Sequence, residues 1–135
     1  MTITFHIPGK AVGKSMRSGR GGLCRYKTKP TRHWMKLISD LARIVAPATP
    51  WEGPVCVCIE VTRRPLKQSK AKVRTMIDGG TLPTTKPDLD NYAKAVCDAM
   101  SDIIYVDDAQ IVRLLVSKRY GETEGTLVNV TRWPV

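Results

Sequence analysis

Residues 55–61 restrict the fold more than any other segment of the chain. They are a nearly continuous run of apolar residues, rich in Val and Ile. Such a run is typical of a strand that neighbouring strands and packed helices cover from several sides. The sequence therefore predicts a sheet in which this strand is central.

The other periodic segments supply helices and further strands around this one. The predicted strands are residues 2–7, 111–120 and 127–131, and the predicted helices are residues 31–45, 67–77 and 88–101. We expect the last two strands to form a hairpin through residues 121–125. The order β-α-β-(α)-α-β-β predicts an α+β, or mixed α/β, fold: one domain over residues 1–135, with helices packed on one mixed sheet of about four strands.

The first predicted helix carries its apolar residues at spacings of three and four. This stripe consists of Trp34, Leu37, Ile38, Leu41, Ile44 and Val45, and prolines follow it. Residues 9–30 are instead rich in glycine and basic residues and poor in apolar ones. A mobile basic loop is predicted there, and loops of this length are usually functional or disordered. Trp34, Trp51 and Trp133 are expected to have core or interface roles.

The charge balance points to a polyanionic partner. The chain has 22 Lys and Arg against 12 Asp and Glu, a net charge of +10. Bound phosphates release counterions when such side chains neutralise them, so nucleic acid is the expected partner. The candidate DNA contacts are Lys10, Lys14, Arg17, Arg20, Arg25, Lys27, Lys29, Arg32, Arg63, Arg64, Lys67, Lys70, Lys72, Arg74 and Lys86.

The acidic residues are concentrated in one short region. Half of them lie between residues 88 and 108, namely Asp88, Asp90, Asp98, Asp102, Asp107 and Asp108. Carboxylates beside a basic surface can hold a divalent cation against a phosphodiester. The simpler alternative is that they solvate a helix and cap its ends.

The sequence Lys86-Pro87-Asp88-Leu89-Asp90-Asn91, with Lys94 following, carries the candidate chemistry. Proline disfavours helix before Asp88, so the helix should begin there and present Asp90 and Lys94 on one face. A strand returning beside this helix could bring Asp107 or Asp108 to its start. Converging carboxylates suit Mg²⁺ or Mn²⁺. Taken singly, these residues could equally be an N-cap, a surface ion pair and a turn.

The segments KPDLDNYAKAVCDAM and YVDDAQIVRLLVSKRY closely resemble the RusA family of Holliday junction resolvases, in particular its phage and prophage subgroup. The shared pattern falls on Asp88, Asp90, Asn91, Lys94, Asp107, Asp108, Gln110 and Ile111. The runs GKAVGKSMR and SKAKVRTMIDGGTLPTTKP are also similar to that subgroup, so the resemblance covers most of the chain.

This resemblance implies a homodimer that binds four-way junction DNA and nicks two strands symmetrically, leaving 5′-phosphate and 3′-hydroxyl ends. It implies that Asp88, Asp90 and Asp108 are metal ligands, with Asp107 as an orienting neighbour or alternative ligand. Lys94 would position the attacking water or stabilise the developing charge, and Asn91 would hold the ligand carboxylates. A non-catalytic junction-binding protein, a general metal-dependent nuclease and an RNA-binding ribosomal-type protein are the alternatives.

Other classes of site are disfavoured by the sequence. Cys56 and Cys58 lie two apart on a predicted strand, and the two other cysteines and the two histidines are isolated. Free thiols are therefore predicted rather than a zinc site or disulfides. No apolar run of about 18 residues suggests a membrane span, and no secretory signal is recognised. We expect a cytoplasmic protein of a bacterial or phage-infected cell, with no small-molecule cofactor.

Overall fold

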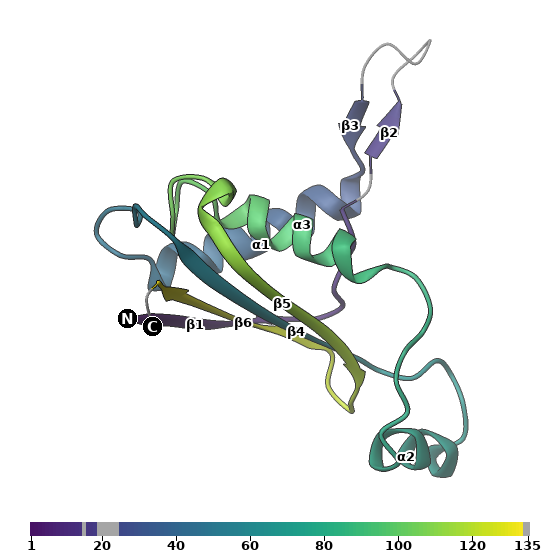
Figure 1. Cartoon of the computed structure of the whole chain (residues 1–135). Helices are drawn as coiled ribbons and strands as arrows, with labels where there is room; N and C mark the ends of the chain where they lie inside the picture. The colour runs from purple at the N-terminus through teal and green to yellow at the C-terminus, as the bar shows by residue number, and fades with distance from the viewer. Residues whose placement is uncertain (15, 19–24, 134–135) are drawn as a thin grey trace.

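The computed structural model describes residues 1–14, 16–18 and 25–133 (Figure 1), with backbone alone at residues 16–18, 25 and 26. The strands are β1 (Thr2–Pro8), β2 (Met16–Ser18), β3 (Arg25–Lys27), β4 (Val55–Arg63), β5 (Ile111–Tyr120) and β6 (Gly125–Arg132). The helices are α1 (Lys29–Val45), α2 (Lys70–Asp78), α3 (Leu89–Met100) and the short 3-10 helix η2 (Asp108–Gln110). The predicted order of elements and the α+β class are confirmed.

The main sheet has four strands in the order β1-β6-β4-β5. Strand β4, the apolar run 55–61, is an interior strand as predicted; it pairs antiparallel with β6 and parallel with β5. The sheet is therefore mixed. Two edges remain, one formed by β1 and the other by β5.

The predicted hairpin between β5 and β6 is wrong, because β4 lies between these two strands. The connection through residues 121–124 spans about 10 Å, twice the distance between neighbouring strands. The physical reason is the hydrophobicity of β4. An interior position buries this strand more completely than an edge position would, and local turn signals do not carry that information.

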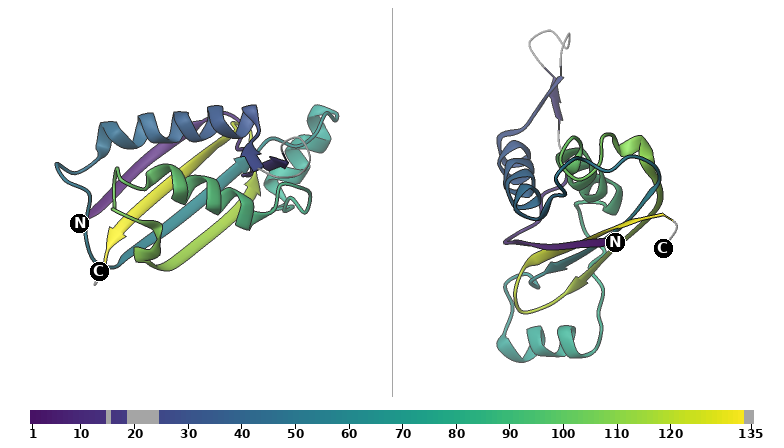
Figure 2. Two further views of the ribbon diagram at one scale, coloured as in Figure 1. Left: turned by 90° about the horizontal axis from the view of Figure 1, so that it is seen from above. Right: turned by 90° about the vertical axis from the view of Figure 1, so that its left-hand side faces the viewer.

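Helices α1 and α3 lie side by side on one face of the sheet (Figure 2). Between the helices and the sheet lie the fully buried side chains of Ile38, Tyr92, Val96, Ile59 and Val128. Burial of each aliphatic side chain contributes about 1.5–3 kcal/mol, so this layer supplies most of the stability. Helices α1 and α3 cover only this face of the sheet. Residues on the opposite face are therefore separated from this core by the sheet.

The apolar stripe of α1 is shorter than predicted. Trp34 and Ile38 are buried, whereas Ile44 is 79% exposed and belongs to the last turn of the helix. The helix also begins two residues earlier than expected, at Lys29, because Pro30 is well suited to a first turn. Trp51 is buried as expected, while Trp133 lies half exposed with the Arg113 guanidinium 6.0 Å from its ring centroid.

Residues 9–30 are not a featureless loop. Within them, β2 and β3 pair antiparallel and project from the body of the protein (Figure 1). We call this the β2–β3 arm. Residues 15 and 19–24, including Arg20, lie outside the described part of the chain, as do the side chains of Arg17 and Arg25.

Helix α2 stands apart from the core. It contains no buried residue, and its start is capped by Ser69, whose side chain accepts a hydrogen bond from the Lys72 backbone N–H. Gly79 follows its last residue, Asp78, as the C-cap. None of the described helices is long and apolar enough to cross a membrane. Cys56, Cys58 and Cys97 are free, as predicted, and Cys24 lies outside the described residues.

Candidate active site

Asp88 occupies the N-cap position of α3, but its side chain does not cap the helix. The carboxylate instead accepts a hydrogen bond from Lys86 Nζ at 3.1 Å and remains half exposed. Helix geometry begins at Leu89, because the proline before Asp88 disfavours a helical conformation upstream. Simple N-capping therefore does not account for Asp88.

Asp90, Lys94 and Asp98 recur at intervals of four residues, which places them on one face of α3. Asp90 and Lys94 line a pocket of about 370 Å³ between this helix and β5, and Asp108 lines it from the start of η2. In the described part of the chain, Asp90 and Lys94 form no ion pair within 4.0 Å, so a surface salt bridge does not explain them. The fold thus brings three predicted site residues into one pocket.

Gln110 explains how Asp108 is held beside α3. Its side chain accepts a hydrogen bond from the Asp107 backbone N–H at 2.8 Å, as in a capping box. Its Nε2 donates to the carbonyl oxygens of Trp51 and Gly53, both at 2.8 Å. Gln110 therefore anchors η2 to the loop before β4, a structural role that the spacing Asp-x-x-Gln signals.

Gln110→Ala is expected to destabilise the protein by about 1–3 kcal/mol, because the Gly53 carbonyl loses its donor and the Trp51 carbonyl keeps only the Val106 N–H. Urea unfolding followed by circular dichroism measures this change. Gln68→Ala, in the exposed loop before α2, is the matched control and should change stability by less than about 0.5 kcal/mol. Equal effects of the two substitutions would contradict the anchoring role.

Asp98 is a site residue to which the sequence assigned no role. Its carboxylate forms an ion pair with Lys14 Nζ. Burial raises the pKa of Asp98, but hydrogen bonds with Lys14 and Asp108 outweigh burial and hold it below the usual value. Hydrogen bonds with the carboxyl groups of Asp98 and Asp107 raise the pKa of Asp108.

These residues partly match a divalent metal site. Among the described residues, no three His, Cys, Asp or Glu side chains lie close enough together to hold a metal ion. Asp90 and Asp108 do share one pocket, which Asp88 does not line. Mg²⁺ usually takes one or two carboxylates and completes its shell with water and phosphate oxygens. Two carboxylates facing one pocket fit that requirement, and crowding of negative charge at Asp108 favours a cation.

Asn91 lies away from the pocket carboxylates. It faces the segment before the β2–β3 arm, and its backbone carbonyl accepts a hydrogen bond from the Lys14 N–H at 3.0 Å. Among the described contacts, its side chain makes no hydrogen bond to Asp88 or Asp90. Nothing in this geometry supports the expectation that Asn91 holds the ligand carboxylates.

Most of the predicted DNA-contact residues are exposed, although Arg74 and Lys86 also form ion pairs within the protein. The exposed ones are Lys10, Lys29, Arg32, Arg64, Lys67, Lys70, Lys72, Arg74 and Lys86, and Lys27 is partly buried. Arg63 donates to the carbonyl oxygens of Thr85 and Lys86, at 3.5 and 3.1 Å, and therefore holds the loop that leads into α3. Lys118, which was not predicted, donates to the carbonyl oxygens of Thr85 and Pro87.

Both basic clusters lie at the end of the molecule where α3 begins. The β2–β3 arm projects on the helical side of the sheet and α2 lies on the other side (Figures 1 and 2). The loops flanking α2 connect this helix to β4 and to α3. A nucleic acid held between these two basic elements would pass the start of α3.

Comparison with known proteins decides the family. The family model described as "Endodeoxyribonuclease RusA" matches residues 8–131. The chain belongs to the RusA endodeoxyribonuclease family. It is also similar to a Bacillus subtilis (strain 168) protein named "Uncharacterized protein YqaN", at 40% identity over 129 residues that cover 89% of each chain. The family resemblance drawn from the motifs is therefore confirmed, and DNA is the partner that a RusA endodeoxyribonuclease acts on.

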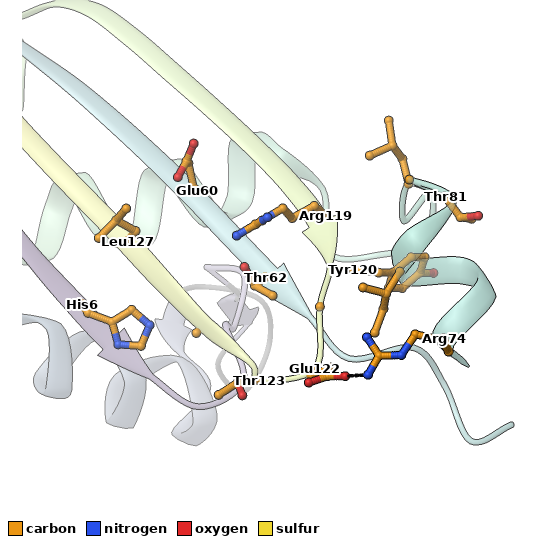
Figure 3. A pocket seen from close by; sticks show the side chains of 15 residues that line it. His6, Glu60, Thr62, Arg74, Thr81, Arg119, Tyr120, Glu122, Thr123 and Leu127 are labelled. Atoms are coloured by element: carbon orange, nitrogen blue, oxygen red, sulfur yellow. Dashed lines mark hydrogen bonds and ion pairs between the residues drawn. The ribbon is translucent and has the colours of Figure 1, made fainter. Parts of the chain in front are cut away.

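A second pocket, of about 750 Å³, lies on the opposite face of the sheet (Figure 3). It is lined by strand residues such as His6, Glu60 and Arg119 and by Arg74 of α2. Arg74 forms an ion pair with Glu122, which fastens α2 to the turn between β5 and β6. None of the predicted carboxylates of this RusA-family chain lines it, so it is separate from the candidate active site.

Proposed function

We propose that this protein resolves Holliday junctions by Mg²⁺-dependent, paired nicking of DNA. The observation that carries the proposal is the single pocket shared by Asp90, Lys94 and Asp108, in a RusA-family chain with a net charge of +10. A protein that only bound phosphates would gain nothing from carboxylates facing the same pocket as a lysine. A metal-dependent nuclease can use this combination, because the carboxylates hold the cation against the phosphate.

In this proposal Asp90 and Asp108 hold the cation, and Asp88, the third predicted ligand, lies at the start of α3 outside their pocket. Mn²⁺ is expected to substitute for Mg²⁺. A bound divalent cation would polarise the scissile phosphate and lower the pKa of a bound water. Asp107, the N-cap residue of η2, would orient Asp108 as its neighbour in the chain.

Lys94 has a separate role. Its side chain lines the same pocket as Asp90 and Asp108 and is not used in an ion pair among the described residues. A positive charge placed there stabilises the negative charge that develops on the phosphate during hydrolysis. Lys94 also can orient the attacking water through one of its three donors.

DNA would be held by Lys10 and Lys29, which are exposed on either side of the β2–β3 arm, and by the exposed lysines of α2. These two elements flank the start of α3 from opposite sides of the sheet plane. Each phosphate contact releases about one counterion, so junction binding should depend steeply on salt concentration.

The test is cleavage of a labelled mobile four-way junction, compared with linear duplex and flap DNA, in Mg²⁺ and in EDTA. Paired nicks on the junction alone, lost in EDTA, support the proposal. Equal cleavage of flaps or duplex ends indicates a general nuclease. Tight junction binding without nicks in Mg²⁺ or Mn²⁺ indicates a non-catalytic junction-binding protein.

A homodimer forms part of the proposal, because two symmetric nicks require two equivalent sites. The edge strand β5 supports a self-association surface. Val112, Leu114 and Leu115 are exposed along it, whereas β1 at the other edge exposes threonines and His6. An exposed apolar edge strand readily pairs with a second chain. Leu114 also lines the candidate pocket, so association there would place two sites near one interface.

Leu115→Glu is expected to convert the dimer to a monomer at micromolar concentration, because it places a charge on a side chain that is 64% exposed at this edge. Light scattering coupled to size-exclusion chromatography measures the mass of each species. Ile44→Glu, at an exposed position on the last turn of α1, is the control and should stay dimeric. A monomeric wild type, or a dimeric Leu115→Glu variant, would refute an interface at β5.

A further inference from the structure

The segment that leads into α3 is held by two cations of the sheet. Its residues 84–86 are exposed, so apolar packing does little to fix them. Lys118 Nζ donates to the carbonyl oxygens of Thr85 and Pro87, at 3.0 and 3.3 Å. Arg63 Nη1 donates to the carbonyl oxygens of Thr85 and Lys86, at 3.5 and 3.1 Å, and to Thr85 Oγ1 at 3.2 Å. Every backbone carbonyl of residues 85–87 therefore has a cationic donor.

The strand register explains why both cations reach this segment. Lys118 of β5 pairs with Val61 of β4, and Arg63 follows Val61 by two residues, so the three side chains share one face of the sheet. Val61 is fully buried, which identifies this face as the one that α1 and α3 cover. Arg63 and Lys118 are half-buried there. Arg119, the next residue, is exposed and lines the pocket on the opposite face.

The bound carbonyl groups lie immediately before the first turn of α3. The Asp88 carbonyl accepts hydrogen bonds from the N–H groups of Asn91 and Tyr92, at 3.2 and 3.3 Å. Asp90 belongs to this turn and lines the candidate pocket. Hydrogen bonds from a charged donor are stronger than those between neutral groups. The position of Asp90 relative to the sheet is thus set by the hydrogen bonds that hold the preceding residues.

The simpler alternative is that these cations bind phosphate, as the sequence predicted for Arg63. The Lys118 ammonium group has three donors, and two of them are used by carbonyl oxygens. Turning either side chain towards DNA would take a donor from carbonyl groups that depend on it, which is costly. The contacts therefore favour an internal role for both residues.

We propose that Arg63 and Lys118 are positioning residues: they hold the entry to α3 against the sheet, thereby set the position of Asp90, and do not contact phosphate. This inference rests on the proposed nuclease function. It changes the role of Arg63 from the phosphate contact that the sequence predicted. It also gives Lys118, to which the sequence assigned no role, a part in cleavage without contact with the DNA.

The first arm of the test is amide hydrogen exchange measured by NMR in EDTA, without DNA. Lys118→Met, which keeps the length of the side chain and removes its donors, should speed exchange at Asn91 and Tyr92 about ten-fold. The Ile59 amide in the interior strand β4 should keep its wild-type rate. Arg119→Met is the matched control and should leave all three amides unchanged. No acceleration, or equal acceleration at Ile59, would overturn the inference.

The second arm is junction binding in EDTA at several salt concentrations. Arg63→Met and Lys118→Met should leave the slope of log affinity against log salt unchanged. Arg64→Met, at the exposed neighbour of Arg63, is the contrasting variant and should reduce its magnitude by about one. A reduction of about one for Arg63→Met or Lys118→Met would show that the residue contacts phosphate and would overturn the inference.

The third arm is single-turnover cleavage of prebound junction in Mg²⁺. Arg63→Met and Lys118→Met should each slow cleavage about ten-fold, since a displacement of about 1 Å at a catalytic group can cost even more. Lys118→Arg keeps a cationic donor and should recover most of the rate, and Arg119→Met should cleave as the wild type does. Wild-type rates in both methionine variants, or no recovery in Lys118→Arg, would overturn the inference.

Circular dichroism establishes that each variant is folded. If Arg63→Met unfolds the chain, Lys118→Met against Lys118→Arg still gives the comparison. If the wild type binds junctions but never cleaves them, the proposed function fails. Hydrogen exchange and the salt slope then still decide whether Arg63 and Lys118 hold the entry to α3 or contact DNA.

Discussion

Asp90→Asn is expected to reduce junction cleavage by about 10³-fold while junction binding stays intact or becomes tighter. The loss corresponds to the several kcal/mol of transition-state stabilisation that a correctly held cation supplies. Binding is preserved because the substitution keeps the shape of the side chain and removes one negative charge that faces the DNA. Asp90 lines the pocket without any ion pair among the described residues, so no structural contact is lost.

The two effects are measured separately, by cleavage in Mg²⁺ and by gel shift in EDTA with the same labelled junction. Asp40→Asn is the matched control, since Asp40 is an exposed acid on α1 that pairs only with Lys36 and Arg43 among the described residues. It should cleave at the wild-type rate. Loss of binding together with cleavage in Asp90→Asn would mean that Asp90 is structural and that the pocket is not the catalytic site.

Lys94→Ala is expected to slow cleavage of bound junction by about 10²–10³-fold with little change in affinity. One ammonium group that stabilises developing charge on the phosphate contributes an effect of this size. Single-turnover kinetics on prebound junction measure the rate, and titration in EDTA measures the affinity.

Lys72→Ala on α2 is the contrasting variant to Lys94→Ala. Lys72 is exposed on an element remote from the pocket, so its loss should weaken binding and leave the rate of the bound complex unchanged. A Lys94→Ala variant that lost affinity but kept its rate would identify Lys94 as one more phosphate contact. Lys94 and Lys72 would then have the same role in binding DNA, whereas the position of Lys94 in the pocket predicts a role in cleavage.

Much of the site follows from spacing within short segments. Asp90 and Lys94 share a helix face because a helix turns once in 3.6 residues, and this relation is local. A strand running back along the helix was expected to bring Asp107 or Asp108 to the start of α3, and β5 does pack against α3. Asp108 lies instead in η2, before β5, and lines the pocket from there. Asp98 lies on the same face and could have been found by extending the interval of four by one more turn.

Lys14 and Gln110 show where sequence reasoning stopped. The partner of Lys14 is 84 positions away, so no local pattern distinguishes this lysine from its exposed neighbours. Gln110 likewise contacts the carbonyl groups of residues 51 and 53, more than 50 positions earlier. The sequence shows the chemical type of each of these side chains. The groups that they contact depend on which segments the sheet brings together.

Local periodicity and composition determined the order of helices and strands, the interior position of β4, the basic character of the protein and the acidic motif of its RusA family. The tertiary structure alone decided that β4 separates β5 from β6, that residues 9–30 contain the paired strands of the β2–β3 arm, and that Lys14 forms an ion pair with Asp98. Hydrophobic periodicity is a property of neighbouring residues, whereas strand order and ion-pair partners depend on burying one shared core. Contacts between distant segments form only when that core is assembled.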